Sequence, residues 1–199
     1  MFAEVLSSTQ SLVHLDLSSN SISTTGGAAI ISSLETNNSL INLNLSSYEG
    51  LSRNTLGPNG VKALRFVLRV NRYLAILSLA GNFIGDIGVG YLCEGLEGNT
   101  TLIELNLAQN EITSEGIKIM EKGFKHSEVQ ILNLSKNPIK NKGAKIIANM
   151  IMRGSDIKID DLNLTECQIT YQGAMSIFIS LKRSLEITKL TLDGNNLNS

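Results

Sequence analysis

Residues 102–112 read Leu-Ile-Glu-Leu-Asn-Leu-Ala-Gln-Asn-Glu-Ile, which follows the pattern L-x-x-L-x-L-x-x-N-x-I. The alternating leucines predict a short strand with one buried face, and the asparagine predicts the turn that ends it. The same pattern recurs at residues 12–22 and 74–84. The chain is therefore predicted to be a series of copies of one structural unit.

The L-x-L cores recur at nearly regular distances along the whole chain. The steps between consecutive cores are 28, 34, 28, 27, 30 and 28 residues. In most copies an isoleucine follows the second leucine by five residues and a glycine follows it by nine. Apolar residues spaced four apart come after the glycine, which predicts an amphipathic helix there. The cores are Leu15/Leu17, Leu43/Leu45, Leu77/Leu79, Leu105/Leu107, Leu132/Leu134, Leu162/Leu164 and Leu190/Leu192.

This strand–turn–helix unit resembles the ribonuclease-inhibitor-like subtype of leucine-rich repeat proteins, and the resemblance covers essentially the whole chain. It implies an α/β solenoid, a right-handed horseshoe with about seven parallel strands on the concave face and helices on the convex face. One unit cannot bury its leucine face alone, whereas stacked units share a continuous core. We expect a single repeat domain over residues 1–199 that is a fragment of a longer array or protein, because neither end shows a polar cap.

When the repeats are aligned, two further positions, which we call columns, predict how the turn and the helix of each unit are held. Asparagine occupies one turn position at Asn20, Asn82, Asn110, Asn137 and Asn195, where its amide can satisfy backbone groups of the turn. Cys167 fills that position in the sixth repeat and is predicted to be structural, and Cys93 is predicted to fill the core. The glycine column is predicted to let each helix approach the strand of its own repeat.

An insertion distinguishes the second repeat from the others. From Leu45 to Leu56 is 11 residues where other repeats use five, so six extra residues lie within the segment 46–55. Such insertions map to one face, often the binding face, although a tolerated surface loop explains the length equally well. The segment carries Tyr48 and Arg53, residue types that dominate protein interfaces. We therefore predict that these two residues bind a partner.

Residues that flank the core leucines are predicted to point away from the core, because side chains alternate along a strand. The column between the leucines is small and polar, whereas the column before them varies in charge and size, which favours partner specificity there. Exposed Ile76 and Ile131 would indicate a contact surface, although single exposed isoleucines are also common. The predicted partner-binding residues are His14, Asp16, Ile76, Glu104, Ile131, Asp161 and Lys189, together with Tyr48 and Arg53.

Composition narrows the function classes. A net charge of −1 argues against nucleic-acid partners and acidic membranes, and two cysteines in 199 residues favour a reducing, cytoplasmic compartment. His14 and His126 lie in different repeats without neighbouring metal ligands. We therefore expect no catalytic, metal or cofactor site and no small-molecule substrate.

The function expected from these observations is a non-catalytic protein–protein interaction module. It would use the concave sheet and the segment 46–55 to bind another protein. The resemblance leaves two alternatives open. One is a GTPase-activating protein similar to the Ran-directed relatives, with Arg53 steadying the transition state. The other is the sensing repeat region of a multidomain receptor or a pathogen effector.

Overall fold

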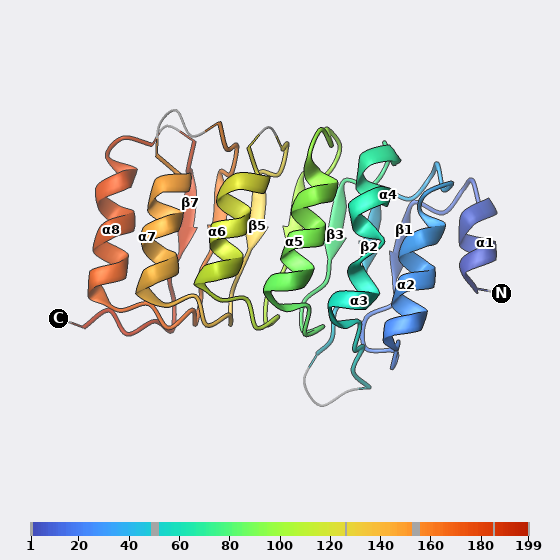
Figure 1. Cartoon of the computed structure of the whole chain (residues 1–199), viewed down its shortest axis with the longest axis horizontal. Helices are drawn as coiled ribbons and strands as arrows, with labels where there is room; N and C mark the ends of the chain where they lie inside the picture. Colours follow the sequence, from blue (N-terminus) through green and yellow to red (C-terminus); the bar gives the residue numbers. More distant parts are fainter. Residues whose placement is uncertain (1, 49–51, 126, 153–155, 185, 199) are drawn as a thin grey trace.

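Strands and helices alternate along an open, curved stack. A computed structural model describes residues 2–48, 52–125, 127–152, 156–184 and 186–198. The strands are β1 (His14–Asp16), β2 (Asn42–Asn44), β3 (Ile76–Ser78), β4 (Glu104–Asn106), β5 (Ile131–Asn133), β6 (Asp161–Asn163) and β7 (Lys189–Thr191). The helices are α1 (Phe2–Ser8), α2 (Thr24–Ser33), α3 (Gly57–Val61), α4 (Leu64–Val70), α5 (Gly85–Leu96), α6 (Ser114–Gly123), α7 (Lys140–Met150) and α8 (Tyr171–Leu181). Figure 1 shows the helices as one layer in front of the strands.

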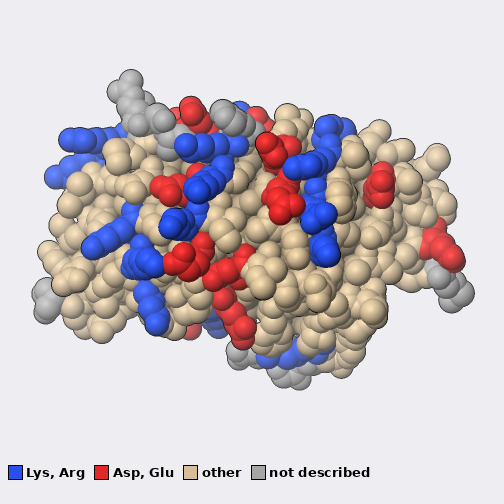
Figure 2. Space-filling view, in the orientation of Figure 1, with Lys and Arg blue, Asp and Glu red and all other residues tan. Residues whose placement is uncertain are grey.

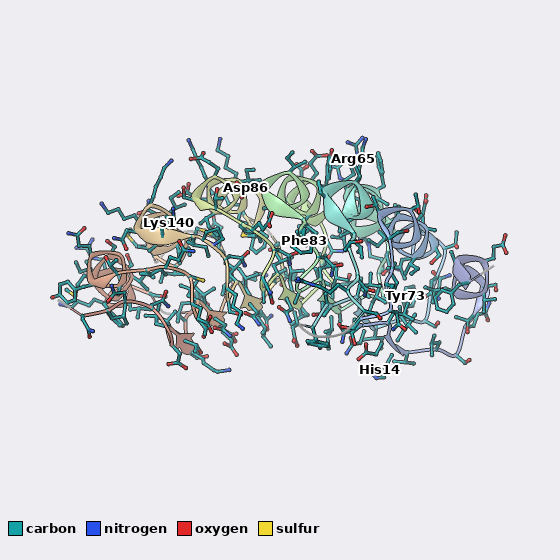
Figure 3. All side chains as sticks on the ribbon, turned by 90° about the horizontal axis from the view of Figure 1, so that it is seen from below. His14, Arg65, Tyr73, Phe83, Asp86 and Lys140 are labelled. Carbon is teal, nitrogen blue, oxygen red and sulfur yellow. The ribbon has the colours of Figure 1, made fainter. Side chains whose placement is uncertain are left out.

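The strands form one parallel sheet in chain order. The register pairs His14 with Asn42, then Asn42 with Ile76, and continues in the same way to Lys189. Equivalent positions of the repeats therefore lie side by side, as the aligned sequence predicts. The solenoid and its seven-stranded parallel sheet are confirmed, and the helices follow an arc outside the strands (Figure 3).

The core lies between the sheet and the helix layer. Both core leucines of each inner repeat, from Leu43 to Leu164, have at most 1% of their surface exposed. Leu15 and Leu190, in the outermost strands, are only partly buried and pack against the core from its ends. Stacking therefore completes the core of each inner unit, because each repeat of a solenoid packs against its two neighbours.

The helices begin earlier than the glycine column predicts. α5 begins at Gly85, before Gly88, and α6 begins at Ser114, before Gly116. The column glycine thus lies in the first helical turn. A Cβ on Gly88 would lie 2.8 Å from the Cβ of Ile84, the isoleucine of the preceding turn. The predicted close approach is therefore made to the turn isoleucine and not to the strand, because that side chain folds under the first turn of the helix.

The second repeat carries two short helices where the spacing predicts one. Pro58 lies in the first turn of α3, and α4 follows after Lys62 and Ala63. Backbone bonds there join residues three apart, for example from the Arg65 nitrogen to the Lys62 oxygen over 3.4 Å. Such tighter turns have poorer hydrogen-bond geometry than an α-helix. They divide the helical part of the second repeat into α3 and α4, which follow one another beside α2 and α5 (Figure 1).

Buried asparagines join neighbouring repeats, as the turn column predicts. The amide of Asn110 donates to the carbonyl oxygens of Leu79 and Ala108, at 2.9 and 3.0 Å. Its oxygen accepts hydrogen bonds from the backbone nitrogens of Asn82 and Ile84. One side chain thus satisfies four backbone groups, three of them in the preceding repeat, which fixes the position of adjacent repeats.

A second asparagine column lies at the opposite edge, where each helix returns to the sheet. Asn71 donates to the carbonyl oxygen of Leu34 at 2.8 Å and accepts from the Leu74 nitrogen at 2.8 Å. Asn37 and Asn99 bond in the same way to the previous repeat. Asparagines therefore tie neighbouring repeats together at this edge from Leu6 to Leu102, in the first half of the stack. Within the described residues, no helix is long and apolar enough to span a bilayer.

Candidate functional site

The first residue of each strand contributes to one row across the concave face. His14, Ile131 and Lys189 are exposed, and Ile76, Glu104 and Asp161 are half-buried. The strand register places these predicted residues in a single line. We call the seven residues the variable row; they are His14, Asn42, Ile76, Glu104, Ile131, Asp161 and Lys189. Figure 3 shows His14 on the strand side, opposite the helices.

The two isoleucines of the variable row differ in exposure. Ile131 has 37% of its surface exposed, as predicted, whereas Ile76 is only half-buried and is not among the exposed large apolar residues. The prediction of a solvent-exposed Ile76 is therefore only partly right. Side chains at the same position of the two neighbouring strands, Asn42 and Glu104, cover part of Ile76.

Charged residues at the β6–β7 end of the row pair with each other. The Lys189 Nζ atom lies 2.8 Å from an Asp161 carboxylate oxygen. The lysine is largely exposed, so this pair adds little to stability. The pair places a cation beside Asp161 on the concave face, whereas Glu104, two strands away, has no ion-pair partner among the described residues.

The last residue of each strand serves the fold as well as the surface. Asp16 accepts a hydrogen bond from the Ser18 nitrogen at 2.8 Å, and its second oxygen accepts one from the Asn44 amide at 3.0 Å. Hydrogen bonds from Ser18 lower the pKa of the Asp16 carboxyl group. Asn44, Asn106, Asn133 and Asn163 hold the turn in the same way. Asp16, predicted to bind a partner, is therefore engaged in the turn at the end of its own strand.

Side chains of β4 to β7 enclose a shallow hollow on the concave face. Its volume is about 250 Å³, and its lining includes Glu104, Ile131, Asp161 and Lys189. Four of the predicted residues therefore meet in one depression. Asn106, Asn133 and Asn163, each at the last position of its strand, also line the hollow. The hollow therefore presents the exposed Ile131 side chain among charged and amide groups.

The inserted segment is tied to the turns of two other repeats. Its residues 49–51 lie outside the described part of the chain. The Tyr48 nitrogen donates to the Ser19 hydroxyl at 2.9 Å, which anchors the segment to the first repeat. At the other end, the Arg53 guanidinium carbon lies 4.8 Å from the centre of the Phe83 ring in the third repeat. The segment therefore bridges three repeats at the edge where the strands end.

Arg53 does not extend freely into solvent, as a surface anchor would. The side chain is half-buried against Phe83, and its Nε atom is buried without a hydrogen-bond acceptor among the described residues. Tyr48 is 51% exposed, as the prediction requires. Contact with an aromatic ring holds the arginine in place, and the prediction that Tyr48 and Arg53 bind a partner stays a prediction.

Sequence reasoning missed two residues of this edge. Phe83 is 38% exposed and has φ of 57°, a left-handed conformation that is unusual for a bulky residue. Asn54 resumes the turn column after the insertion, with its amide donating to the Leu17 and Leu45 carbonyl oxygens. Its distance of two residues before Leu56 could have revealed it, since Asn20 stands two residues before Ile22. Figure 3, which faces this edge, shows Phe83 between His14 and Asp86.

The cysteines occupy buried positions, as predicted. Cys93 is 6% exposed on α5, and burial raises the pKa of its thiol to about 12. Burial likewise raises the pKa of Cys167 to about 11, and the sulfur lies 3.2 Å from the Leu134 oxygen. Neither thiol is poised as a nucleophile, because the thiolate is the reactive form. The described residues contain no cluster of metal-ligating side chains, and His126 lies outside them.

Five segments of the chain match the family model described as Leucine Rich repeat. They are residues 9–30, 70–93, 98–118, 127–148 and 158–178, which together exceed half of the chain. The chain belongs to the leucine-rich repeat family.

Relatives in two groups share the repeats of this leucine-rich repeat chain. It is 25% identical over 197 residues to human NACHT, LRR and PYD domains-containing protein 5, covering 98% of this chain and 16% of the relative. It is 29% identical over 197 residues to mouse ribonuclease inhibitor, covering 96% and 41%. The chain thus spans less than half the length of these relatives. The second likeness confirms the ribonuclease-inhibitor-like subtype.

Proposed function

We propose that this leucine-rich repeat chain is a protein-binding module that acts by contact and not by catalysis. The partner would lie on the variable row of the concave face and reach the edge formed by Tyr48, Arg53 and Phe83. The observation that carries the proposal is the variable row itself. Seven side chains that differ in charge and size, two of them isoleucines, stand in register on a sheet whose turns are held by asparagines.

The chemistry of the surface supports this proposal. The hollow places the exposed Ile131 between Glu104 and Asp161, so an apolar contact is surrounded by polar groups. Protein interfaces commonly have this arrangement, with an apolar centre and a polar rim. A specific interface buries roughly 800 Å² on each partner, which several strands and the neighbouring edge together can supply.

The edge supplies the residue types that anchor interfaces. Tyr48 is exposed and Arg53 already lies against Phe83, so little conformational entropy remains to be lost when a partner binds. The stacked position of Arg53 does not favour the GTPase-activating alternative, which stays a prediction.

The test combines site-specific crosslinking with titration. A photoreactive residue in place of Ile131 is expected to crosslink the partner, whereas one in place of Lys145 on α7 is not. With that partner in hand, Ile131→Asp and the double variant Tyr48→Ala/Arg53→Ala should each weaken binding at least tenfold, and Lys145→Ala should not. Unchanged affinity in both concave and edge variants, with thermal unfolding confirming the fold, would refute the proposed surface.

A further inference from the structure

A groove separates two helices on the convex face, away from the proposed binding surface. Its volume is about 710 Å³, and it lies between α5 and α6. Gly90, Cys93 and Ile119 contribute small and apolar surface to it. A Cβ on Gly90 would meet no atom within 4 Å, so the α5 wall is open at that point and could receive a side chain from outside.

Lysines form one side of this groove. Lys118, Lys122 and Lys125 follow one another at spacings of four and three residues. Lys118 and Lys122 share one face of α6, whereas Lys125 lies two residues beyond the end of that helix at Gly123. Within the described residues, none of the three lysines makes an ion pair.

The carboxylates of the groove are engaged by cations of the neighbouring helices. Glu97 lies 3.1 Å from the guanidinium of Arg69, and Glu94 lies 3.9 Å from the guanidinium of Arg65. Both arginines belong to α4. Glu115 pairs with Lys142 on α7, and this pair lowers the pKa of the glutamate. The ion pairs of these acidic side chains are thus made with residues outside the groove, although Lys118 also favours the charged form of Glu115. Lys122 and Lys125 make no ion pair within the part of the chain that the structure describes. Figure 2 shows basic and acidic side chains interspersed over this face.

We propose that this groove is a second interaction surface, which binds a short acidic helix of another protein. Glutamates at positions i and i+4 of such a helix would match Lys118 and Lys122 on α6 in spacing and charge, and one at i+7 would pair with Lys125 beyond the end of α6. One apolar side chain on the same face would enter the opening at Gly90 and contact Ile119. Binding of an amphipathic helix in a groove is a recurrent mode of peptide recognition.

A phosphate polymer fits the groove less well. Its charge is spread evenly along the chain, so it would also approach Glu94, Glu97 and Glu115. It has no apolar side chain for the opening at Gly90. The apolar opening and the discrete spacing of the lysines therefore favour a peptide.

The test uses a fluorescein-labelled alanine-based helical peptide with Glu at i, i+4 and i+7 and Leu at i+3. Fluorescence anisotropy at low salt should show saturable binding to the wild-type chain. A matched peptide with Gln in place of Glu should bind at least tenfold more weakly. The double variant Lys118→Glu/Lys122→Glu should also lose at least tenfold in affinity, because it reverses the charge of the wall.

Two further variants separate the groove from general surface charge. Gly90→Leu places a side chain where a Cβ would meet no atom within 4 Å and replaces a helical glycine. It should therefore fold, as thermal unfolding will check, and still weaken binding at least tenfold. Lys140→Glu/Lys145→Glu makes the same charge change on α7, outside the groove, and should bind like the wild type. The proposal is overturned by an absence of saturable binding, by full affinity in Gly90→Leu, by equal loss in the α7 control, or by tighter binding of inorganic polyphosphate than of the peptide.

Discussion

Asp86 of α5 accepts two hydrogen bonds from Thr113, the residue that caps the next helix. The Thr113 nitrogen lies 2.8 Å from Oδ1, and its hydroxyl lies 2.6 Å from Oδ2. Asn141 and Thr170 make a corresponding pair of bonds: the Asn141 oxygen accepts from the Thr170 nitrogen at 2.8 Å, and the Asn141 amide donates to the Thr170 hydroxyl at 2.7 Å. Each pair connects the first turn of one helix to the start of the next and therefore fixes the spacing of the helix layer. Figure 3 shows Asp86 on that layer.

Removing these two hydrogen bonds, which we call the Asp86–Thr113 clamp, should lower the free energy of unfolding. Asp86→Ala leaves the part-buried Thr113 nitrogen without its acceptor, which costs about 1–3 kcal/mol in the free energy of unfolding. Asp86→Asn should cost less, because an asparagine makes both bonds at position 141. Urea unfolding followed by circular dichroism measures both. Equal stability of the alanine and asparagine variants would show that the hydrogen bonds contribute nothing.

Replacing Gly116 and Gly90 by alanine should change the free energy of unfolding in opposite directions. A Cβ on Gly116 would lie 2.4 Å from the Asp86 Oδ1 atom and 2.7 Å from Ile112 Cγ2. Gly116→Ala should therefore lower the free energy of unfolding by about 1–3 kcal/mol through overpacking. Gly90→Ala meets open space and should raise it by up to about 1 kcal/mol through helix propensity. Denaturant titration of the two variants decides this, and a shift in the same direction for both would contradict it.

Replacing a buried asparagine of the turn column should lower the free energy of unfolding more than replacing an asparagine of the concave face. Asn110→Ala leaves four backbone groups without their partner. Two or more unsatisfied buried groups cost about 1–3 kcal/mol each, so this variant should be among the least stable. Asn106→Ala, on the concave face, loses one hydrogen bond to the Ala108 nitrogen and should cost about 1 kcal/mol. Thermal melts would contradict the expectation if the two variants were equally stable.

Alkaline pH should destabilise the fold through its buried thiols. The pKa rises from 9.0 to about 12 for Cys93 and to about 11 for Cys167 on folding. Since the native state holds these protons more tightly, the contribution is complete below pH 9 and is lost as the pH rises from 9 towards the folded values. One unit above the unfolded pKa, each thiol should cost about 1.4 kcal/mol.

The measurement compares the wild type with Cys93→Ala/Cys167→Ala under reducing conditions. The difference in free energy of unfolding between pH 8 and pH 10 should be larger for the wild type. Other titrating groups are common to both proteins and cancel. An identical pH dependence would show that the thiols are not buried in the way described.

Loss of the Arg53 contact should loosen one end of the inserted segment while leaving the solenoid intact. Phe83→Ala removes the ring over which the guanidinium lies, a contact of about 0.5–1 kcal/mol at an exposed site. The melting temperature should therefore change little. Hydrogen exchange of the Ser21 amide, which donates to the Ser52 oxygen at 3.2 Å, should become faster. Unchanged exchange would show that the stacked arginine does not hold the segment.

The sequence by itself determined the repeat unit, the strand positions and the sides on which side chains lie. Leucines two apart mark strand faces, because the side-chain period of a strand is two. The column alignment also predicted which residues form the variable row, because identical units stack in register. The turn asparagines and Cys167 were identified for the same reason.

The tertiary structure alone decided which side chains meet across repeats. Arg53 and Phe83 are 30 residues apart, and their contact depends on how an inserted segment folds over the next turn. The second asparagine column, the clamp from Asp86 to Thr113 and the lysine-lined groove likewise join residues of neighbouring units. Local spacing specifies the unit, whereas the distance and rotation between stacked units, which follow from close packing, determine what each surface can bind.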